Sequence, residues 1–328
     1  MVVSHGRNGT GISCACPGCH VDARKLCGDR LGKLPPHRKH LPAQVKRFNT
    51  GQHMRKVIDS NILQAEALRI YLAQSQHNYA VLTDWAAMEA YKGHTLQSIY
   101  RSMEILATRP KQVVILKGTQ AICGLRGRRA GLQRRMIDDI QTMGFAEYCR
   151  NLQVARNGDR RIERRLLVHE REANSQMDRL LTDARLIPDV IEAIANTYSK
   201  AELQLLRARR PLTDEMLSKT SRNIREVVTT VFRDHPKVQK LPHRHEFANT
   251  YLFRFAICAY VWALRLIFAG GAAHTKAENL RNDMVDICFV VYGTFFDGLL
   301  TADGGAIELY DDMKWWLDTL CEHTRRHS

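Results

Sequence analysis

Apolar and polar positions follow two different periods along this chain, and together they predict short strands that alternate with helices. Four short apolar runs bounded by polar or turn residues are typical of buried parallel strands; they lie at 56–63, 79–82, 112–116 and 298–301. Apolar residues at helical spacing fill most of the remaining chain. Strands that alternate with helices in this order predict an α/β fold with a central parallel sheet.

The apolar segment at 282–296 predicts a buried helix with an acidic start. Asp283 and Asp286 are three residues apart, so they share one face of a helix. The rest of the segment is apolar nearly all round, which indicates deep burial. Thr301 and Asp303 then follow the strand expected at 298–301. Acids at a helix start and just past a strand end are expected to meet in one crevice of an α/β sheet.

Two further acids are predicted near the same place. Asp59 and Asn61 lie at the carboxyl end of the first expected strand, where parallel-sheet enzymes carry their chemistry. Thr83 follows the second strand and predicts a helix cap. The helix that follows carries Glu89. Taken alone, Glu89 is either a solvated surface residue or a ligand that faces a site.

These motifs in this order resemble the PIN-like nuclease family. The resemblance covers 54–118 and 276–310, and it implies a three-layer α/β/α domain around a central parallel sheet. In that family four carboxylates bind divalent metal; the matching residues here are Asp59, Glu89, Asp286 and Asp303. Asp286 lies 17 residues before Asp303, which suits the family better than the 20 residues from Asp283, so Asp283 is expected to be auxiliary. Asn61 and Thr301 match the polar residues that support the acids.

The activity that this resemblance implies is metal-dependent hydrolysis of phosphodiester bonds, with an endoribonuclease favoured because most family members act on RNA. Four carboxylates at close range repel one another, so they need cations to stay ionised. Oxygen-only ligands suit Mg²⁺ or Mn²⁺. The alternative is a nucleic-acid-binding or scaffold protein on a degenerate PIN-like fold. A haloacid-dehalogenase-like phosphatase needs Asp-x-Asp after the first strand, and Asp59-Ser60-Asn61 does not supply it.

The two halves of the expected domain are separated by an all-helical insertion. We therefore divide the chain into a tail at 1–53, a first half at 54–118, an insertion at 119–275, and a second half with a terminal helix at 276–328. The closing strand expected after the last acid is not evident in the sequence. A homo-oligomer is left open.

The net charge of +15 favours an anionic partner, with nucleic acid ahead of an anionic membrane. A basic loop leading into a helix follows residue 118, and its arginines are candidates for phosphate contact: Arg126, Arg128, Arg129, Arg134 and Arg135. A second basic run lies at 160–165. For both runs the competing interpretation is a solvated helix face.

The tail at 1–53 holds nine Lys or Arg against two Asp, a net of +7, and we expect it to be disordered. Its Cys and His residues predict at most an incomplete zinc site; they are Cys14, Cys16, Cys19, His20 and Cys27. Met54 precedes the first strand as a start residue would. Scattered cysteines and the lack of a signal peptide after Met1 predict a cytoplasmic protein. The longest apolar run, 255–264, is about half of the ~20 residues that span a membrane, so no membrane association is expected.

Overall fold

The computed structural model describes residues 2–6, 9–13, 53–91, 96–208, 210–236, 238 and 241–326. Its centre is a four-stranded sheet in the order β5-β4-β3-β6, and every pairing in it is parallel. The strands are β3 (Met54–Ile58), β4 (Asn78–Leu82), β5 (Val113–Ile115) and β6 (Leu299–Leu300). All four overlap the apolar runs that predict strands, so the α/β fold class is confirmed.

The first strand is shorter than the sequence predicts. It ends at Ile58, and residues Ser60–Ile62 form a 3-10 turn, η1. The turn closes because the backbone N–H of Ile62 donates to the carbonyl of Asp59 at 3.1 Å. Since β3 lies between β4 and β6, this turn stands at the middle of the sheet's carboxyl edge.

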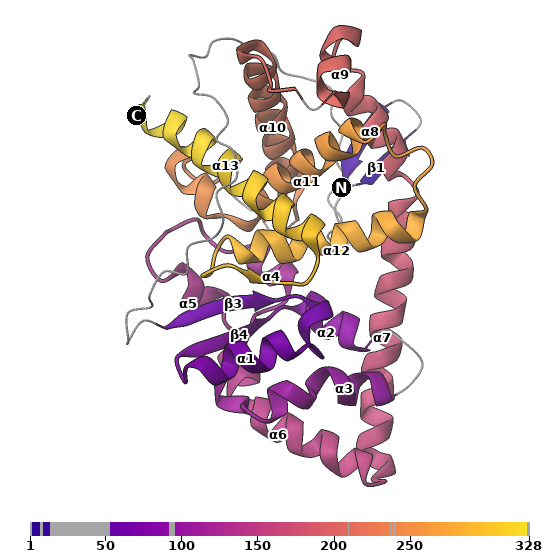
Figure 1. Cartoon of the computed structure of the whole chain (residues 1–328), viewed down its shortest axis with the longest axis vertical. Helices are drawn as coiled ribbons and strands as arrows, with labels where there is room; N and C mark the ends of the chain where they lie inside the picture. Colours follow the sequence, from indigo (N-terminus) through magenta and orange to yellow (C-terminus); the bar gives the residue numbers. More distant parts are fainter. Residues whose placement is uncertain are drawn as a thin grey trace.

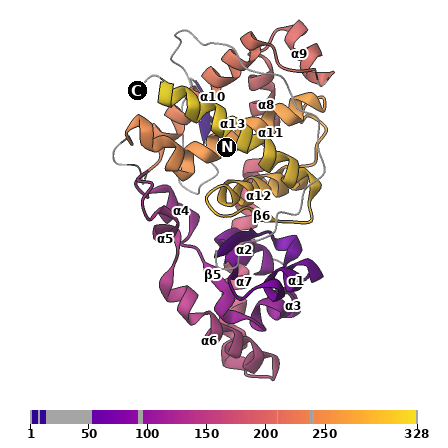
Figure 2. The same cartoon turned by 60° about the vertical axis from the view of Figure 1, so that its left-hand side comes forward.

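Helices enclose the sheet on two sides (Figures 1 and 2). Below it lie α1 (Glu66–Gln74) and α3 (Leu96–Ala107), and α1 packs against β4. Above it lie α12 (Ala277–Gly293) and α13 (Gly304–Arg326), and α12 contacts both β3 and β6. The helix α2 (Asp84–Tyr91) follows β4 and is capped by Thr83, whose Oγ1 accepts from the N–H of Ala86 at 3.1 Å. This arrangement is compatible with a three-layer α/β/α fold.

The described residues of the insertion at 119–275 are helical apart from loops and a 3-10 turn. An isolated bridge joins Ile137 of the insertion to Leu116 just before it. The helices of the insertion are α4 (Thr119–Cys123), α5 (Leu132–Met136), α6 (Asp139–Arg156), α7 (Arg160–Ala184), α8 (Ile187–Ala195), α9 (Lys200–Arg207), α10 (Asp214–Asp234) and α11 (Tyr251–Phe268), with η3 (Arg244–Asn249) before α11. These helices share one apolar core with the sheet domain. α7 packs against both α2 and α12, and α11 packs against α12 and α13.

The helix α11 is apolar over nearly its whole length. By length and composition alone it is long and apolar enough to cross a membrane, with a mean hydropathy of 1.6. Here it packs among α10, α12 and α13, so core burial accounts for its apolar sequence. It ends before Gly270 and Gly271, whose positive φ angles of 104° and 100° favour glycine. The glycine pair therefore ends the helix.

The helix that carries the acids begins earlier than predicted. α12 starts at Ala277 rather than near residue 282, because Lys276 stands at its N-cap and Glu278 occupies the first turn. Asp283 and Asp286 therefore lie in the interior of the helix and not at its start. The prediction of an acidic helix start was wrong, and the two carboxylates gain little from the helix dipole, which acts mainly on the first turn.

Within the tail, the structure describes two strands, β1 (Val2–Gly6) and β2 (Gly9–Ser13), which pair antiparallel. The zinc candidates at Cys14, Cys16, Cys19, His20 and Cys27 lie outside the described residues.

Candidate functional site

Asp59 is the centre of a polar cluster at the carboxyl edge of the sheet. It follows β3, its side chain is buried, and its backbone N–H donates to the carbonyl of Leu300 at 3.0 Å. Its Oδ2 accepts hydrogen bonds from Thr301 Oγ1 at 2.5 Å and from Asn61 Nδ2 at 2.7 Å. Burial and the nearby charge of Glu89 raise the pKa of Asp59, and the hydrogen bond from Thr301 opposes this rise.

Asn61 and Thr301 hold the ends of β3 and β6 together. Asn61 Nδ2 also donates to Thr301 Oγ1 at 3.2 Å, and Asn61 Oδ1 accepts from the N–H of Ala302 at 3.1 Å. Thr301 Oγ1 accepts a further hydrogen bond from the N–H of Asp303 at 3.0 Å. The two residues expected to support the acids therefore contact Asp59 directly and fix its carboxylate from one side.

Glu89 reaches the cluster from α2. Ser60 Oγ donates to Glu89 Oε2 and lies 3.4 Å from Asp59 Oδ1. The hydroxyl has one hydrogen, so it serves one carboxylate at a time. Ser60 is not among the site residues predicted from the sequence, although its position directly after Asp59 at a strand end could have indicated it.

The start of α2 is anchored by a second carboxylate, that of the half-buried Asp84. Its side chain accepts from the N–H of Thr119 at 2.6 Å and from Thr119 Oγ1 at 2.8 Å. Burial raises the pKa of Asp84, and the hydrogen bonds from Thr119 oppose this. Because Thr119 begins α4 just past β5, this contact ties the helix that carries Glu89 to the neighbouring strand end.

Asp286 shows the strongest electrostatic effect in the cluster. Burial, and after it the charges of nearby carboxylates, together raise the pKa of Asp286 to about 8; in decreasing order of effect these carboxylates are Asp59, Asp303, Asp283 and Glu89. A charged side chain shifts the pKa of a carboxyl group strongly only at short range. The other four acids predicted from the sequence therefore lie near enough to Asp286 for their charges to raise its pKa.

Asp283 lies one turn away from Asp286 on the same helix. Trp262 Nε1 of α11 donates to Asp283 Oδ2 at 3.3 Å. Burial raises the pKa of Asp283, the bond from Trp262 opposes this, and Asp303 adds to the rise. One of its oxygens is thus occupied by the protein, which suits the auxiliary position expected for it. No feature of the sequence indicated the contact with Trp262.

Asp303 has a structural task as well. Its Oδ1 accepts from the N–H of Ala306 at 3.1 Å, and its carbonyl accepts from Ile307 at 3.1 Å. The side chain therefore caps the start of α13. Asp303 is exposed, which places it at the solvent side of the cluster.

The chemistry of the cluster fits a hard divalent cation. The donors are carboxylate oxygens, with hydroxyl and amide oxygens beside them, and such sets suit Mg²⁺ or Mn²⁺. Among the described residues, however, no three His, Cys, Asp or Glu side chains form a group that could hold a metal ion as they stand. The carboxylates are near enough to raise the pKa of Asp286, but they do not form a complete set of metal ligands.

The predicted arginines lie elsewhere. Gln133 of α5 accepts from Arg55 at 3.3 Å, and Arg55 stands at the amino-terminal end of β3, opposite to the end that carries Asp59. Figure 1 shows α5 on the side of the sheet away from α7. Arg135 donates to the carbonyls of Arg126 and Arg128, so it braces the loop. The other arginines are exposed; they are Arg126, Arg128, Arg129 and Arg134, the last paired with Asp139.

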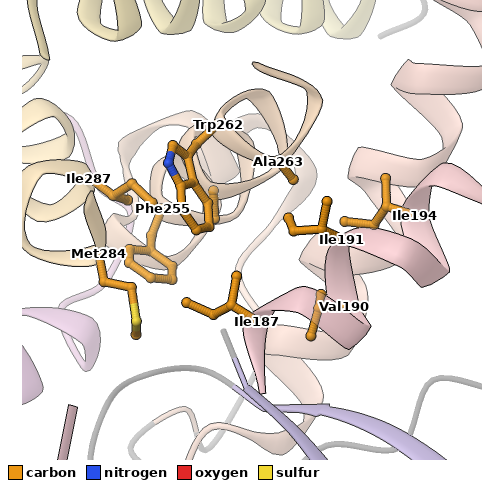
Figure 3. A pocket seen from close by; sticks show the side chains of 10 residues that line it. Ile187, Val190, Ile191, Ile194, Phe255, Trp262, Ala263, Met284 and Ile287 are labelled. Carbon is orange, nitrogen blue, oxygen red and sulfur yellow. The ribbon is translucent and has the colours of Figure 1, made fainter. Parts of the chain in front are cut away.

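A small apolar cavity lies between α8, α11 and α12. Figure 3 shows Trp262, Met284 and Ile287 pointing into it with the apolar residues of α8. Its volume is about 20 Å³, room for one water, and an apolar lining of this kind stays dry. The cavity therefore reflects imperfect packing between the three helices.

We found no match to this chain among protein-family models, curated proteins or solved structures. The family resemblance therefore rests on the motifs and their placement alone.

Proposed function

We propose that this chain is a Mg²⁺- or Mn²⁺-dependent nuclease of PIN-like architecture that hydrolyses phosphodiester bonds, with RNA favoured over DNA. The observation that carries the proposal is the electrostatic coupling of Asp286 to Asp59, Asp303, Asp283 and Glu89. These five acids come from four separate chain segments, and their mutual charge effects support a shared site near the carboxyl edge of the parallel sheet, where α/β enzymes bind their ligands.

The pKa of Asp286 supports a cation at this place. At neutral pH a carboxyl group with a pKa of about 8 is mostly protonated, because ionisation would add another charge to a partly buried acidic cluster. A divalent cation would reverse this balance and favour the ionised form. Asp59, Glu89, Asp286 and Asp303 would hold it, with Asp283 as the auxiliary acid.

The residues of the chain have separate tasks in this proposal. A bound Mg²⁺ or Mn²⁺ would supply a water of lowered pKa and neutralise charge on the phosphate. Thr301 and Asn61 orient Asp59, since both donate to the same carboxylate oxygen. Ser60, the first residue of the turn η1, can donate its hydroxyl hydrogen to Glu89 or to Asp59, one at a time. Asp84 positions α2 through Thr119.

Cleavage assays with Asp59→Asn test the proposal. The substitution keeps size and hydrogen bonding but removes one negative charge, so we expect it to abolish most Mn²⁺-dependent cleavage of mixed RNA and DNA oligonucleotides. Asp178→Asn is the matched control. Asp178 is exposed on α7, so this variant should cleave the oligonucleotides as the wild type does. Equal cleavage by Asp59→Asn and the wild type would refute the proposal.

The second candidate is a nucleic-acid-binding protein without catalysis. The cap that Asp303 provides to α13 favours it, because this acid has a structural reason to be present. So does the lack, among the described residues, of a preformed group of metal ligands. Under this alternative, Mn²⁺ leaves the melting temperature unchanged, whereas a metal site stabilises the fold as Mn²⁺ exceeds its Kd.

A further inference from the structure

A second basic surface lies at the junction of α6 and α7. We call it the α7 basic surface; its arginines are Arg156, Arg160, Arg161, Arg164 and Arg165, and all five are exposed. Residues four apart on a helix are neighbours, so the four arginines of α7 form two adjacent pairs along its first turns. No ion pair joins them to a carboxylate among the described residues.

The two acids in this stretch do not cancel the charge. Asp159 is the N-cap of α7, and its Oδ1 accepts from the backbone N–H of Arg161 at 2.9 Å and of Ile162 at 3.1 Å. These bonds lower the pKa of Asp159, with a smaller contribution from Arg161 and Arg165. Glu163 is half-buried. Residues 156–165 therefore keep a net charge of +3, from five arginines and two acids.

An aromatic side chain stands beside these arginines. Tyr100 of α3 is half-exposed, and its hydroxyl lies near enough to Glu163 and Arg156 for both to affect its pKa, although burial is the larger cause of the rise. Proteins that bind single-stranded nucleic acid combine a basic track for the backbone with aromatic rings on which bases stack. The junction offers both.

The helix α7 leads from this surface to the acids. The ring of His169 meets that of Tyr91 edge to face, with centroids 6.1 Å apart, and Tyr91 is two residues beyond Glu89 in α2. At about 1.5 Å per residue, Arg160 and His169 are separated by about 14 Å along the helix. α7 then packs against α12, which carries Asp283 and Asp286. Figure 1 shows α7 running along the side of the sheet where α2 lies.

We propose that the α7 basic surface, with Tyr100, binds the backbone of a single-stranded nucleic acid and directs it along α7 toward the acidic cluster. The course of the nucleic acid toward the acidic cluster rests on the nuclease function proposed above, whereas its binding to the α7 basic surface does not. The assignment moves phosphate contact away from the loop at 126–129, which lies toward the other end of β3.

Two triple variants with equal loss of charge test this proposal. One is Arg161→Gln, Arg164→Gln and Arg165→Gln; the control is Arg126→Gln, Arg128→Gln and Arg129→Gln. Fluorescence anisotropy of a labelled single-stranded RNA is followed over a series of salt concentrations in EDTA, so that no cleavage occurs. Three lost phosphate contacts should reduce the slope of log K against log salt by about 2, and the loop variant should keep the wild-type slope.

The outcomes separate this proposal from the nuclease function. A selective loss of RNA binding in the α7 variant supports the surface even if the wild type never cleaves. Cleavage by the wild type with unchanged binding by the α7 variant overturns the surface and leaves the nuclease standing. An equal loss in both variants overturns it too, because only overall charge would matter. Loss of binding to phosphatidylcholine–phosphatidylserine vesicles with RNA binding intact would assign the surface to a membrane and overturn it.

Discussion

Replacing Asp286 with asparagine should stabilise the protein, and the gain should depend on pH. The side chain is partly buried among Asp59, Asp303, Asp283 and Glu89, which together with burial raise its pKa to about 8. Asparagine has nearly the same shape and carries no charge. The substitution therefore removes the cost of an ionised group at this place and leaves the packing of α12 intact.

The sign and size of the effect follow from the two pKa values of Asp286. Its pKa is 3.8 in the unfolded chain and about 8 in the folded one, so the folded state holds the proton more tightly and stability falls as pH rises between these values. A difference of about 4 pH units at about 1.4 kcal/mol each sets an upper bound of about 6 kcal/mol above pH 8. Near pH 5 the same reasoning gives about 1–2 kcal/mol.

Urea unfolding in EDTA at about pH 5 and about pH 8.5 measures this difference. We expect Asp286→Asn to exceed the wild type in unfolding free energy at both values, with the larger gain at the higher pH. Asp178→Asn, at an exposed position, should show no gain at either. A loss of stability in Asp286→Asn, or a gain independent of pH, would refute the acidic cluster around α12. Added Mn²⁺ should reduce the difference in unfolding free energy between Asp286→Asn and the wild type, because only the wild type keeps the full set of acids to bind the metal.

Two further substitutions test the support of the site and the fold around it. Thr301→Val keeps the shape but removes the donor to Asp59, so it should lower the unfolding free energy by about 1–3 kcal/mol and raise the pKa of Asp59 further, as carboxyl NMR titration would show; Thr229→Val, at an exposed helix position, should be nearly neutral. Gly127→Ala places a Cβ 2.5 Å from a backbone carbonyl oxygen of η3 and should cost about 1–3 kcal/mol by thermal unfolding. In Gly144→Ala the added Cβ meets nothing within 4 Å, so this variant should stabilise α6 by about 0.5–1 kcal/mol. If Gly144→Ala destabilised the protein more than Gly127→Ala does, the packing of the loop around Gly127 would be contradicted.

The sheet could be predicted from the sequence because buried parallel strands leave a local pattern. Each strand is a short apolar run between polar or turn residues, and each was found within a few residues of its place. Boundaries were less accurate where backbone hydrogen bonds decide them. Asp59 closes a 3-10 turn that shortens β3, and no apolar period reports such a bond.

The members of the acidic cluster could be named, but their environment could not. Asp59, Glu89, Asp286 and Asp303 carry a family-like order along the chain, and strand ends predict their meeting. The start of α12 was placed too late, since its first turns are polar and lack the apolar signal. The bond from Trp262 to Asp283 joins two helices, so it depends on tertiary packing that no local pattern encodes.

The basic segments show the same limit. Charge runs identify arginines that face solvent, but they do not tell which end of a sheet those arginines reach. Arg126, Arg128 and Arg129 lie in a loop toward the amino-terminal side of β3, whereas α7 carries its arginines alongside α2. The positions of these two basic surfaces relative to the sheet follow only from the folded path of the chain.

The most direct measurement of the central claim is a crystal structure of the full chain soaked in Mn²⁺, with the anomalous signal recorded at the manganese absorption edge. The nuclease account predicts an anomalous peak among Asp59, Glu89, Asp286 and Asp303, and its loss in Asp59→Asn. Mn²⁺ bound only elsewhere, or the same peak in the variant and the wild type, would contradict the assignment of these carboxylates to a catalytic metal site.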